Sequence, residues 1–217
     1  MLKINPAAPE REIIREAVEV LKEGGIIIYP TETCYGLGAD ALNENAVRKV
    51  YEAKERPTSK PLSIAVADLE MAKKYAIFTP EAEKLARRFL PGPLTIALPK
   101  REIIPDIVNP TAIAIRIPDN KIALEIIREL GRPITATSAN MSGEPPPYSV
   151  EEAIKSLKHR FDLALDAGTL YGLKPSTVVD FTREPSPQIT REGPISPEEI
   201  LRTLGIPKEE WKKHIIQ

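Results

Sequence analysis

The sequence predicts an α/β fold with a mixed sheet of parallel and antiparallel strands. Two patterns indicate this fold: amphipathic helices and short apolar strands alternate in the earlier part of the chain, and strand segments cluster after residue 160. The chain has 217 residues, of which 42% are hydrophobic and 28% charged. This length and balance are those of one domain with a substantial core.

Helix patterns recur along the chain with clear start and stop signals. In the first predicted helix, over residues 11–21, apolar residues repeat every three or four positions, and the pair Gly24-Gly25 ends the helix. Asn43, Thr79 and Ser149 are predicted N-caps, and Pro80 suits the first turn of its helix. The predicted helices lie at residues 11–21, 43–51, 79–90, 121–131, 149–158 and 196–205.

Short apolar runs between the helices predict strands. They lie at residues 24–30, 61–68, 94–99, 112–118, 133–140, 163–168, 176–182 and 187–193. No repeat and no convincing linker interrupts this pattern. We therefore expect one catalytic domain over residues 1–205 and a short polar tail over residues 206–217.

The composition excludes several classes of protein. Cys34 is the single cysteine, so a disulfide within the chain is impossible and a cysteine-based zinc site is not expected. The net charge of −1 argues against a general nucleic-acid coat. No leader and no apolar stretch of membrane-spanning length is visible, so we expect a cytoplasmic protein without a membrane contact. The 22 prolines and only two glutamines suggest a thermophile.

The segment YPTETCYGLGAD follows the first predicted core strand. It places the hydroxyls of Thr31, Thr33 and Tyr35, together with Gly36 and Gly38, at the carboxyl end of that strand. Ligands of α/β proteins tend to bind at such ends. A tight turn with capping threonines is the alternative interpretation. No plausible histidine partner for Cys34 is visible in the sequence, so we do not expect Cys34 to be a nucleophile.

The segment AKERPTSKP carries three cations, Lys54, Arg56 and Lys60, on a loop stiffened by Pro57 and Pro61. Several cations on a constrained loop suit a polyphosphate. A Walker-type GxxxxGK[ST] motif is absent. A solvated basic helix end is the alternative; it suits Lys54 well and Lys60, beyond the helix, poorly.

Three further features could line a pocket. The segment TATSANMSG, residues 135–143, offers small hydroxyl and amide groups without charge. Arg116 stands within a strand and would hold a carboxylate if it faced a cleft. Ser176 begins a predicted strand and Arg191 ends one. Each of these is a weak signal alone.

Taken in order, seven segments resemble the YrdC-like threonylcarbamoyl-AMP synthases over roughly residues 10–204: PTETCYGLG, KERPTSKPL, PGPLTIAL, AIRIPD, TSANMSG, STVVD and TREG. The resemblance implies a twisted mixed sheet with a concave basic cleft. It also implies a nucleotidyltransferase that condenses L-threonine, bicarbonate and ATP into threonylcarbamoyl-AMP and pyrophosphate, with Mg²⁺ carried by ATP and not by protein side chains. A separate tRNA threonylcarbamoyl transferase would then modify adenosine 37 of tRNA.

The resemblance also implies roles for individual residues. The implied catalytic residues are Lys54, Arg56 and Lys60. The positions expected to contact ATP are Arg56, Lys60, Ala112, Ser138, Asn140, Pro146 and Arg191. The positions expected to contact threonine are Thr31, Thr33, Arg116, Ala136 and Ser176. Because proline has no N–H, a contact at Pro146 would use its carbonyl or its ring.

Two departures from the family pattern stand out. Many relatives carry a histidine in a KPL-x-x-H pattern, where this chain has Ala65; the hydrogen bond of that histidine is lost, and we expect a rebuilt or wetter pocket. The sequence also resembles the single-domain form, so we expect no additional C-terminal domain. Closure of the site would then come from a local loop or from the tail.

Three alternatives come from other functional classes. The first is a non-catalytic module of the same fold that binds double-stranded RNA or tRNA through a basic groove. The second is a domain that forms carbamoyl-adenylate from carbamoyl phosphate, which in its relatives accompanies zinc-binding cysteines that this sequence lacks. The third is a ligand-binding paralogue without turnover.

Overall fold

The structure, a computed structural model, describes residues 1–172 and 174–216; Leu173 and Gln217, the last residue of the predicted tail, lie outside it. Within those ranges the strands form two mixed sheets, of order β1-β9-β2-β3-β8 and β11-β10-β5-β6-β4-β7. The strands of the first sheet are β1 (Leu2–Lys3), β2 (Ile27–Pro30), β3 (Tyr35–Gly38), β8 (Thr137–Ser138) and β9 (Leu163–Asp166). Those of the second are β4 (Ser63–Ala65), β5 (Leu94–Pro99), β6 (Ala112–Arg116), β7 (Ile134–Thr135), β10 (Thr177–Asp180) and β11 (Gln188–Arg191).

Both sheets combine parallel and antiparallel pairing, which confirms the predicted α/β class. In the first sheet β2 pairs in parallel with β9 and antiparallel with β3. In the second, β5 pairs in parallel with β10 and antiparallel with β6. The difference from the sequence-based expectation is that hydrogen bonding divides the strands between two sheets.

The two sheets meet at residues 134–138, where the sequence predicts a strand that runs into a loop. Here β7 pairs with β4 in the second sheet, while β8 pairs with β3 in the first. Between them, the N–H of Ala136 donates to the carbonyl of Ser63 at 2.7 Å, and the N–H of Thr135 donates to that of Ala39 at 2.9 Å. The backbone therefore changes sheets at Ala136, and this change places the following Thr137 and Ser138 beside both sheets.

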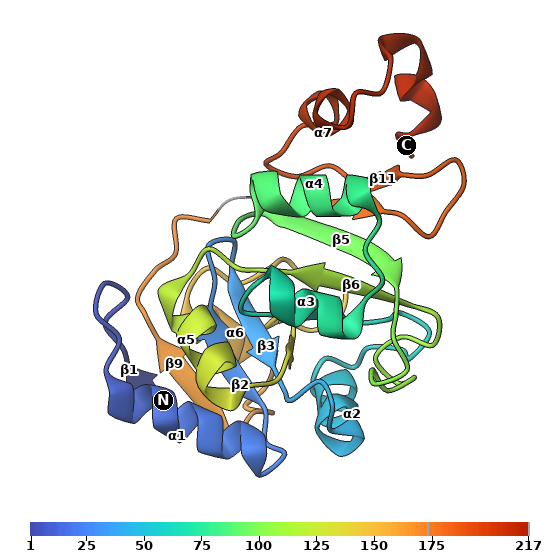
Figure 1. Ribbon diagram of the computed structural model, residues 1–217. Coiled ribbons are helices and arrows are strands. Elements are labelled where there is room, and N and C mark those ends of the chain that lie inside the picture. The colour runs from blue at the N-terminus through green and yellow to red at the C-terminus, as the bar shows by residue number, and fades with distance from the viewer. Residues whose placement is uncertain (173, 217) are drawn as a thin grey trace.

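The helices flank the sheets in the order that the patterns predict. Their bounds are α1 (Arg11–Lys22), α2 (Glu44–Ala53), α3 (Leu69–Tyr75), α4 (Pro80–Phe89), α5 (Lys121–Leu130), α6 (Val150–Ser156) and α7 (Pro197–Leu204), followed by the 3-10 helix η1 (Lys208–Lys213). The predicted caps are present: Asn43, Thr79 and Ser149 each accept hydrogen bonds from backbone N–H groups of their helices. Figure 1 shows α1 beside β1 and β9 at one end of the molecule, with α4 and α7 at the other.

Four elements were not predicted: β1, β3, α3 and η1. Strand β3 was expected to be a loop because its sequence, YGLG, is rich in glycine. Its glycines are required by packing, since a Cβ on Gly38 would lie 2.9 Å from the ring of Tyr29. The expected polar tail is attached to β11, where the N–H of Ile189 donates to the carbonyl of His214 at 2.7 Å.

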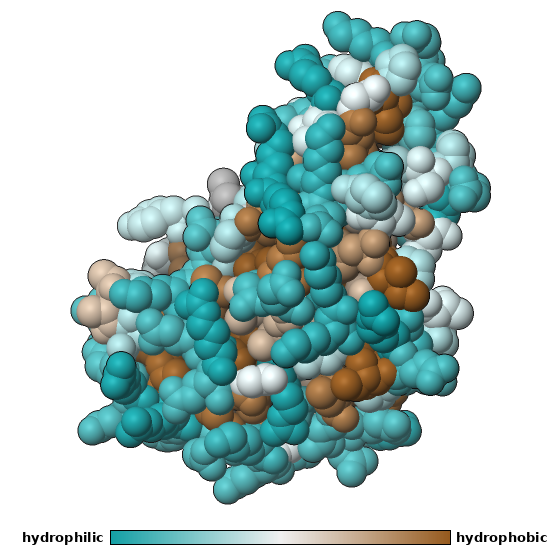
Figure 2. Space-filling model, in the orientation of Figure 1, coloured by the Kyte–Doolittle hydropathy of each residue, from teal (hydrophilic) through white to brown (hydrophobic). Residues whose placement is uncertain are grey.

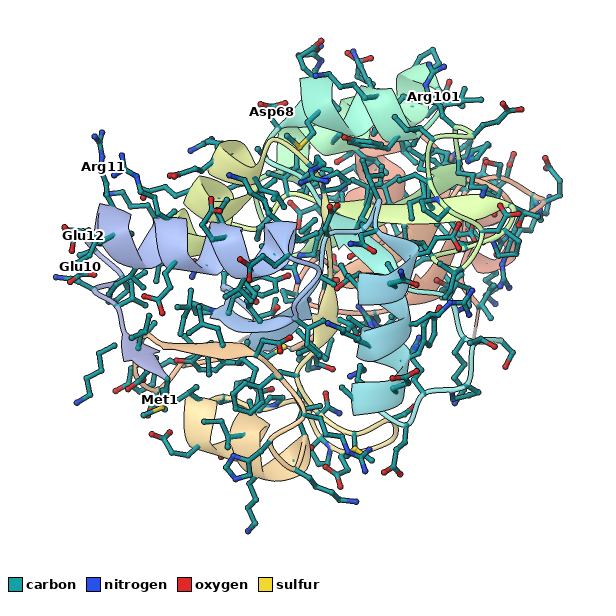
Figure 3. All side chains as sticks on the ribbon, turned by 90° about the horizontal axis from the view of Figure 1, so that it is seen from below. Met1, Glu10, Arg11, Glu12, Asp68 and Arg101 are labelled. Carbon is teal, nitrogen blue, oxygen red and sulfur yellow. The ribbon has the colours of Figure 1, made fainter. Side chains whose placement is uncertain are left out.

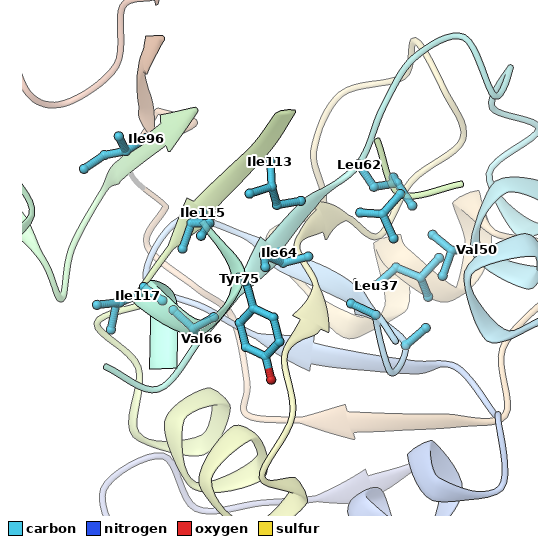
Figure 4. Packing of buried hydrophobic residues seen from close by; sticks show 14 of the residues in the cluster. Leu37, Val50, Leu62, Ile64, Val66, Tyr75, Ile96, Ile113, Ile115 and Ile117 are labelled. Atoms are coloured by element: carbon cyan, nitrogen blue, oxygen red, sulfur yellow. The ribbon is translucent and has the colours of Figure 1, made fainter. Parts of the chain in front are cut away.

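Buried aliphatic side chains from both sheets form the core. Figure 4 shows members of one cluster: Ile64, Ile113 and Ile115 from the second sheet, Leu37 from the first and Val50 from α2. A second cluster joins α1 and α5 to the other side of β2. These clusters hold the two sheets in a fixed relation, which is the condition for a site between them.

The face of the molecule seen in Figure 2 is predominantly polar. Figure 2 shows hydrophilic residues over most of one face, with hydrophobic residues confined to separate areas. In Figure 3, seen from below, the charged side chains of Glu10, Arg11 and Glu12 project outward from the start of α1. None of the helices among the described residues has the length and apolar character needed to cross a bilayer.

Candidate functional site

A cavity of about 260 Å³ lies between the two sheets. Its lining comes from β2, β3, β4, β5, β6, β8 and β11, from the loops that follow β2, α2 and β8, and from the residues just before β8 and β10. Nine of the thirteen predicted site residues line it: Thr31, Thr33, Arg56, Arg116, Ala136, Ser138, Pro146, Ser176 and Arg191. The fold thus brings together residues that lie far apart in the sequence, from position 31 to position 191.

The loop between β2 and β3 presents two neighbouring hydroxyls to this cavity. The hydroxyl of Thr31 donates to the carbonyl of Cys34 at 2.6 Å and accepts from the backbone N–H groups of Thr33 and Cys34, each at 3.2 Å. The hydroxyls of Thr31 and Thr33 lie 3.0 Å apart. Thr33 itself accepts from Nη1 of Arg116 at 3.2 Å. Because a hydroxyl oxygen has two lone pairs, Thr33 keeps one that can accept a hydrogen bond from a ligand.

Arg116 lies at the end of β6, and its guanidinium is held from two sides. Nη1 donates to Thr33, and Nη2 donates to Oε1 of Glu32. The side chains of both Glu32 and Arg116 are only 12% exposed. Because each Nη carries two hydrogens, each keeps one for a ligand after these bonds are made. A carboxylate is the ligand that two parallel N–H groups fit best.

Ser176 and Arg191 form another part of the cavity wall. Arg191 Nε donates to the carbonyl of Ser176 at 2.9 Å, and Nη2 donates to its hydroxyl at 3.0 Å. The same hydroxyl lies 2.7 Å from that of Thr95 on β5. Burial lowers the pKa of Arg191, and the like charge of Arg116 lowers it further. Arg191 therefore adds positive charge to this wall, which suits an anionic group of a ligand.

The loop after α2 is shaped by Arg56. Its Nε donates to the carbonyl of Lys60 at 2.8 Å, and its Nη2 donates to that of Pro61 at 2.9 Å. Arg56 thereby folds the loop back on itself and still lines the cavity. The side chain of Lys60 is exposed and lies outside the cavity lining. Its contact with ATP stays a prediction, which requires the side chain to reach a ligand at the mouth of the cavity.

Lys54 is buried behind the cavity, with 2% of its surface exposed. Its ammonium donates to the carbonyls of Ser138 and Asn140, the latter at 2.6 Å. Its own carbonyl accepts from the N–H of Ser142 at 2.8 Å. Burial, with the like charge of Arg56, lowers its pKa from 10.5 to about 8. The predicted catalytic role of Lys54 stays a prediction, and the structure places its ammonium against the backbone that carries Ser138.

The remaining predicted positions lie near the cavity without lining it. Asn140 is buried, and its amide nitrogen donates to the carbonyls of Met141 and Glu144. Ala112 begins β6 and lies outside the lining. Ala65, where relatives of the expected type carry histidine, is buried in β4 beside Arg116 in the ladder. No side chain at position 65 therefore offers a polar group to the site.

Sequence reasoning missed several lining residues and one residue behind them. Tyr29, Thr95 and Cys34 line the cavity, and Glu32 pairs with Arg116. Glu32 stands in the motif between Thr31 and Thr33, but its partner lies 84 positions away, so its role was not visible in the sequence. Among the described residues, no cluster of three or more His, Cys, Asp or Glu side chains could hold a metal ion.

Comparison with known proteins assigns the chain to a family. The family described as "Sua5_yciO_yrdC: Telomere recombination" matches residues 19–193, and the protein belongs to it, which confirms the predicted family. The chain is 43% identical over 196 residues to the threonylcarbamoyl-AMP synthase of Pyrococcus abyssi, covering 88% of this chain and 57% of that protein.

Solved structures agree with the fold. The P. abyssi Sua5 structure complexed with L-threonine matches with a TM-score of 0.88 and 41% identity, over 94% of this chain and 60% of that one. Escherichia coli YciO matches with a TM-score of 0.81 and 30% identity, over 89% of this chain and 95% of that one. The chain thus spans somewhat more than half of the P. abyssi protein and nearly all of YciO.

Proposed function

We propose that the protein is an L-threonylcarbamoyladenylate synthase, a nucleotidyltransferase that condenses L-threonine, bicarbonate and ATP into threonylcarbamoyl-AMP and pyrophosphate. One observation carries the proposal: three guanidinium groups, from Arg56, Arg116 and Arg191, line the same cavity as the hydroxyls of Thr33 and Ser176. This arrangement suits a small hydroxylated amino acid lying beside a polyphosphate. It is supported by the similarity to the P. abyssi enzyme and to a structure of that protein with L-threonine.

The amino acid would lie against β6 and the β2–β3 loop. The carboxylate of threonine would receive the free Nη hydrogens of Arg116, and Thr33 would accept from its hydroxyl or its amine. Ala136 would limit the space available to the side chain. At about 260 Å³ the cavity is slightly smaller than the roughly 300–1,000 Å³ of typical ligand sites. It would therefore enclose the amino acid and the reacting phosphate, with the adenosine at its mouth.

The triphosphate would lie along the other wall. Arg56 and Arg191 would neutralise its oxygens, with Ser138, Pro146 and their neighbours fixing the nucleotide. Mg²⁺ bound to the phosphates would supply additional positive charge to the leaving pyrophosphate. Lys60, on its exposed loop, would close over the phosphates once they are bound.

The chemistry needs orientation and charge compensation more than a nucleophilic side chain. The ammonium of threonine first loses a proton to solvent; the resulting amine attacks the carbon of bicarbonate, and one water is lost as the carbamate forms. An oxygen of the carbamate then attacks the α-phosphorus of ATP, and the bond to pyrophosphate breaks. Proximity and electrostatic stabilisation can supply the acceleration of such steps. A downstream transferase would carry the threonylcarbamoyl group to adenosine 37 of tRNA in the cytoplasm.

The experiment that tests this proposal measures pyrophosphate release. Release should require L-threonine, bicarbonate and ATP together, and L-serine should support it less well. Arg56→Ala should cut turnover severely, since it removes a lining cation and the hydrogen bonds that fold residues 57–61. Lys60→Ala should raise the KM for ATP more than it lowers kcat. A kcat near that of the wild type in Arg56→Ala would refute the role of Arg56, and an unchanged KM for ATP in Lys60→Ala would refute the role of Lys60.

The alternative of a non-catalytic RNA-binding module is tested in the same samples. A binding module would retain RNA with a steep dependence on salt and would be indifferent to threonine. The cluster of hydroxyls within a cavity of about 260 Å³ favours the enzyme, because a phosphate backbone requires a long groove.

A further inference from the structure

Glu32 is the acidic residue that contacts the cationic lining of the cavity. It lies in the loop between β2 and β3, and its Oε1 accepts from Nη2 of Arg116. Both side chains are 12% exposed, so this is a buried ion pair within a site that otherwise presents Arg56 and Arg191. The pair offsets the positive charge of Arg116 within a cavity that Arg56 and Arg191 also line.

The ion pair is incompletely satisfied. Oε2 of Glu32 and Nε of Arg116 are buried and have no hydrogen-bond partner within the described part of the chain. Buried polar atoms of this kind are costly, and a protein retains them chiefly where function requires them. A hydrophobic pair would satisfy the fold at this position without that cost. The pair is therefore better explained by what it does to the guanidinium than by stability.

Two consequences for Arg116 follow. With Glu32 on one side and Thr33 on the other, the guanidinium plane is fixed and directs its remaining Nη hydrogens at the cavity. The carboxylate also cancels the charge of the guanidinium, so this part of the cavity carries no net charge. The part lined by Arg56 and Arg191 remains cationic.

We infer that Glu32 is a positioning and specificity-determining residue that makes the Arg116 part of the cavity select a zwitterionic amino acid over an anionic carboxylic acid. The inference rests on the proposed function and adds a residue to it. A zwitterion has no net charge and matches a neutral ion pair. A simple carboxylate or a phosphate oxygen would add an uncompensated negative charge beside Glu32, and such groups are directed instead to the cationic wall.

Glu32→Gln tests the inference because it keeps the shape and the acceptor oxygen but removes the charge. Calorimetry would compare L-threonine with (R)-3-hydroxybutanoate, which is threonine without its amine. The wild type should bind threonine and discriminate against the deaminated analogue. In Glu32→Gln, the discrimination should fall at least tenfold, because the anionic analogue no longer meets the charge of Glu32 and binds more tightly, while the affinities for threonine and ATP change less.

Two further variants keep the result interpretable. Glu32→Asp retains the charge, so it should retain the discrimination even where both ligands bind more weakly. Glu16→Gln, on the exposed face of α1, controls for loss of a carboxylate elsewhere. Thermal unfolding would show which variants are folded; if Glu32→Gln is not, the Glu32→Asp comparison decides.

The outcomes separate this inference from the proposed function. Unchanged discrimination in Glu32→Gln would overturn the inference, as would loss of discrimination in Glu32→Asp. Glu32-dependent discrimination without any pyrophosphate release would support the inference and refute the proposed activity. Pyrophosphate release with unchanged discrimination in Glu32→Gln would do the reverse. A wild type that binds no L-threonine would refute both.

Discussion

Replacement of Lys54 by methionine tests how the site is held together. Lys54 Nζ donates to the carbonyls of Ser138 and Asn140 and is 2% exposed. Methionine fills a similar space but cannot donate. The carbonyl of Ser138 keeps a second donor, the N–H of Asn140 at 3.0 Å, whereas that of Asn140 loses the ammonium that it accepts from. We therefore expect the segment 138–140 to move.

The magnitude follows from two opposing effects. Hydrogen bonds to a charged donor contribute about 1.5–3 kcal/mol each to stability. Burial penalises the ammonium, as its lowered pKa of about 8 indicates, and methionine removes that penalty. We expect a net loss of about 2 kcal/mol in the free energy of unfolding at neutral pH. Catalysis should fall by roughly 10- to 100-fold, since a displacement of about 1 Å at a reacting site has effects of that size.

Urea unfolding and steady-state pyrophosphate release measure the two effects. Lys49→Met is the matched control, because Lys49 lies on the same helix and donates to a single carbonyl, that of Gly24 at 2.8 Å, away from the cavity. It should lose some stability and retain its turnover. Turnover in Lys54→Met within twofold of the wild type would refute the reasoning that Lys54 positions Ser138.

Three further predictions concern pH, packing and reactivity. The pKa of Lys54 is about 8 in the folded state and near the ordinary 10.5 in the unfolded chain, so the unfolded chain binds more protons between these values. The free energy of unfolding of the wild type should therefore rise relative to that of Lys54→Met as pH rises from about 7 to about 9.5. A difference that stays unchanged in urea titrations would contradict this. Gly193→Ala should lower the free energy of unfolding by about 1–3 kcal/mol and impair turnover, because the new Cβ would lie 2.3 Å from the carbonyl oxygen of Pro175 and 2.5 Å from the nitrogen of Thr177. Glu192→Ala, at an exposed neighbouring position, is the control, and equal melting of the two variants in calorimetry would contradict the prediction. Burial raises the pKa of the Cys34 thiol, so iodoacetamide should alkylate Cys34 more slowly in the folded protein than in urea. Alkylation should be slower still with ATP and L-threonine present, because Cys34 lines the cavity. Equal rates in all three conditions, measured by mass spectrometry, would contradict this prediction.

Local patterns predicted most elements because their causes are local. The cap at Ser149 depends on Glu152, three positions away, and the two form a complete capping box. Helix α5 ends where Gly131 adopts a left-handed conformation with φ of 69°. Strand β3 could not be predicted in this way, because its glycines are required by close packing against the ring of Tyr29 in the neighbouring strand.

For the candidate site, too, some features were visible in the sequence and others only in the structure. Motif resemblance named Arg56, Arg116, Ser176 and Arg191, and the cavity that they share is a finding of the structure. Neither the exposed position of Lys60 nor the contacts of Lys54 with two carbonyls was visible in the segment that contains them. These depend on where the loop after α2 meets the segment after β8.

By itself, the sequence determined the α/β class, the family and the residue types available for chemistry, since periodicity, caps and motifs are properties of neighbouring residues. Tertiary structure alone decided the division into two sheets, the change of sheet at Ala136 and the pairing of Glu32 with Arg116. The physical reason is that a buried charge needs a partner in space, and the chain supplies that partner from a distant strand. Which cation faces the cavity, and with what net charge, is therefore fixed by packing between segments far apart in the sequence.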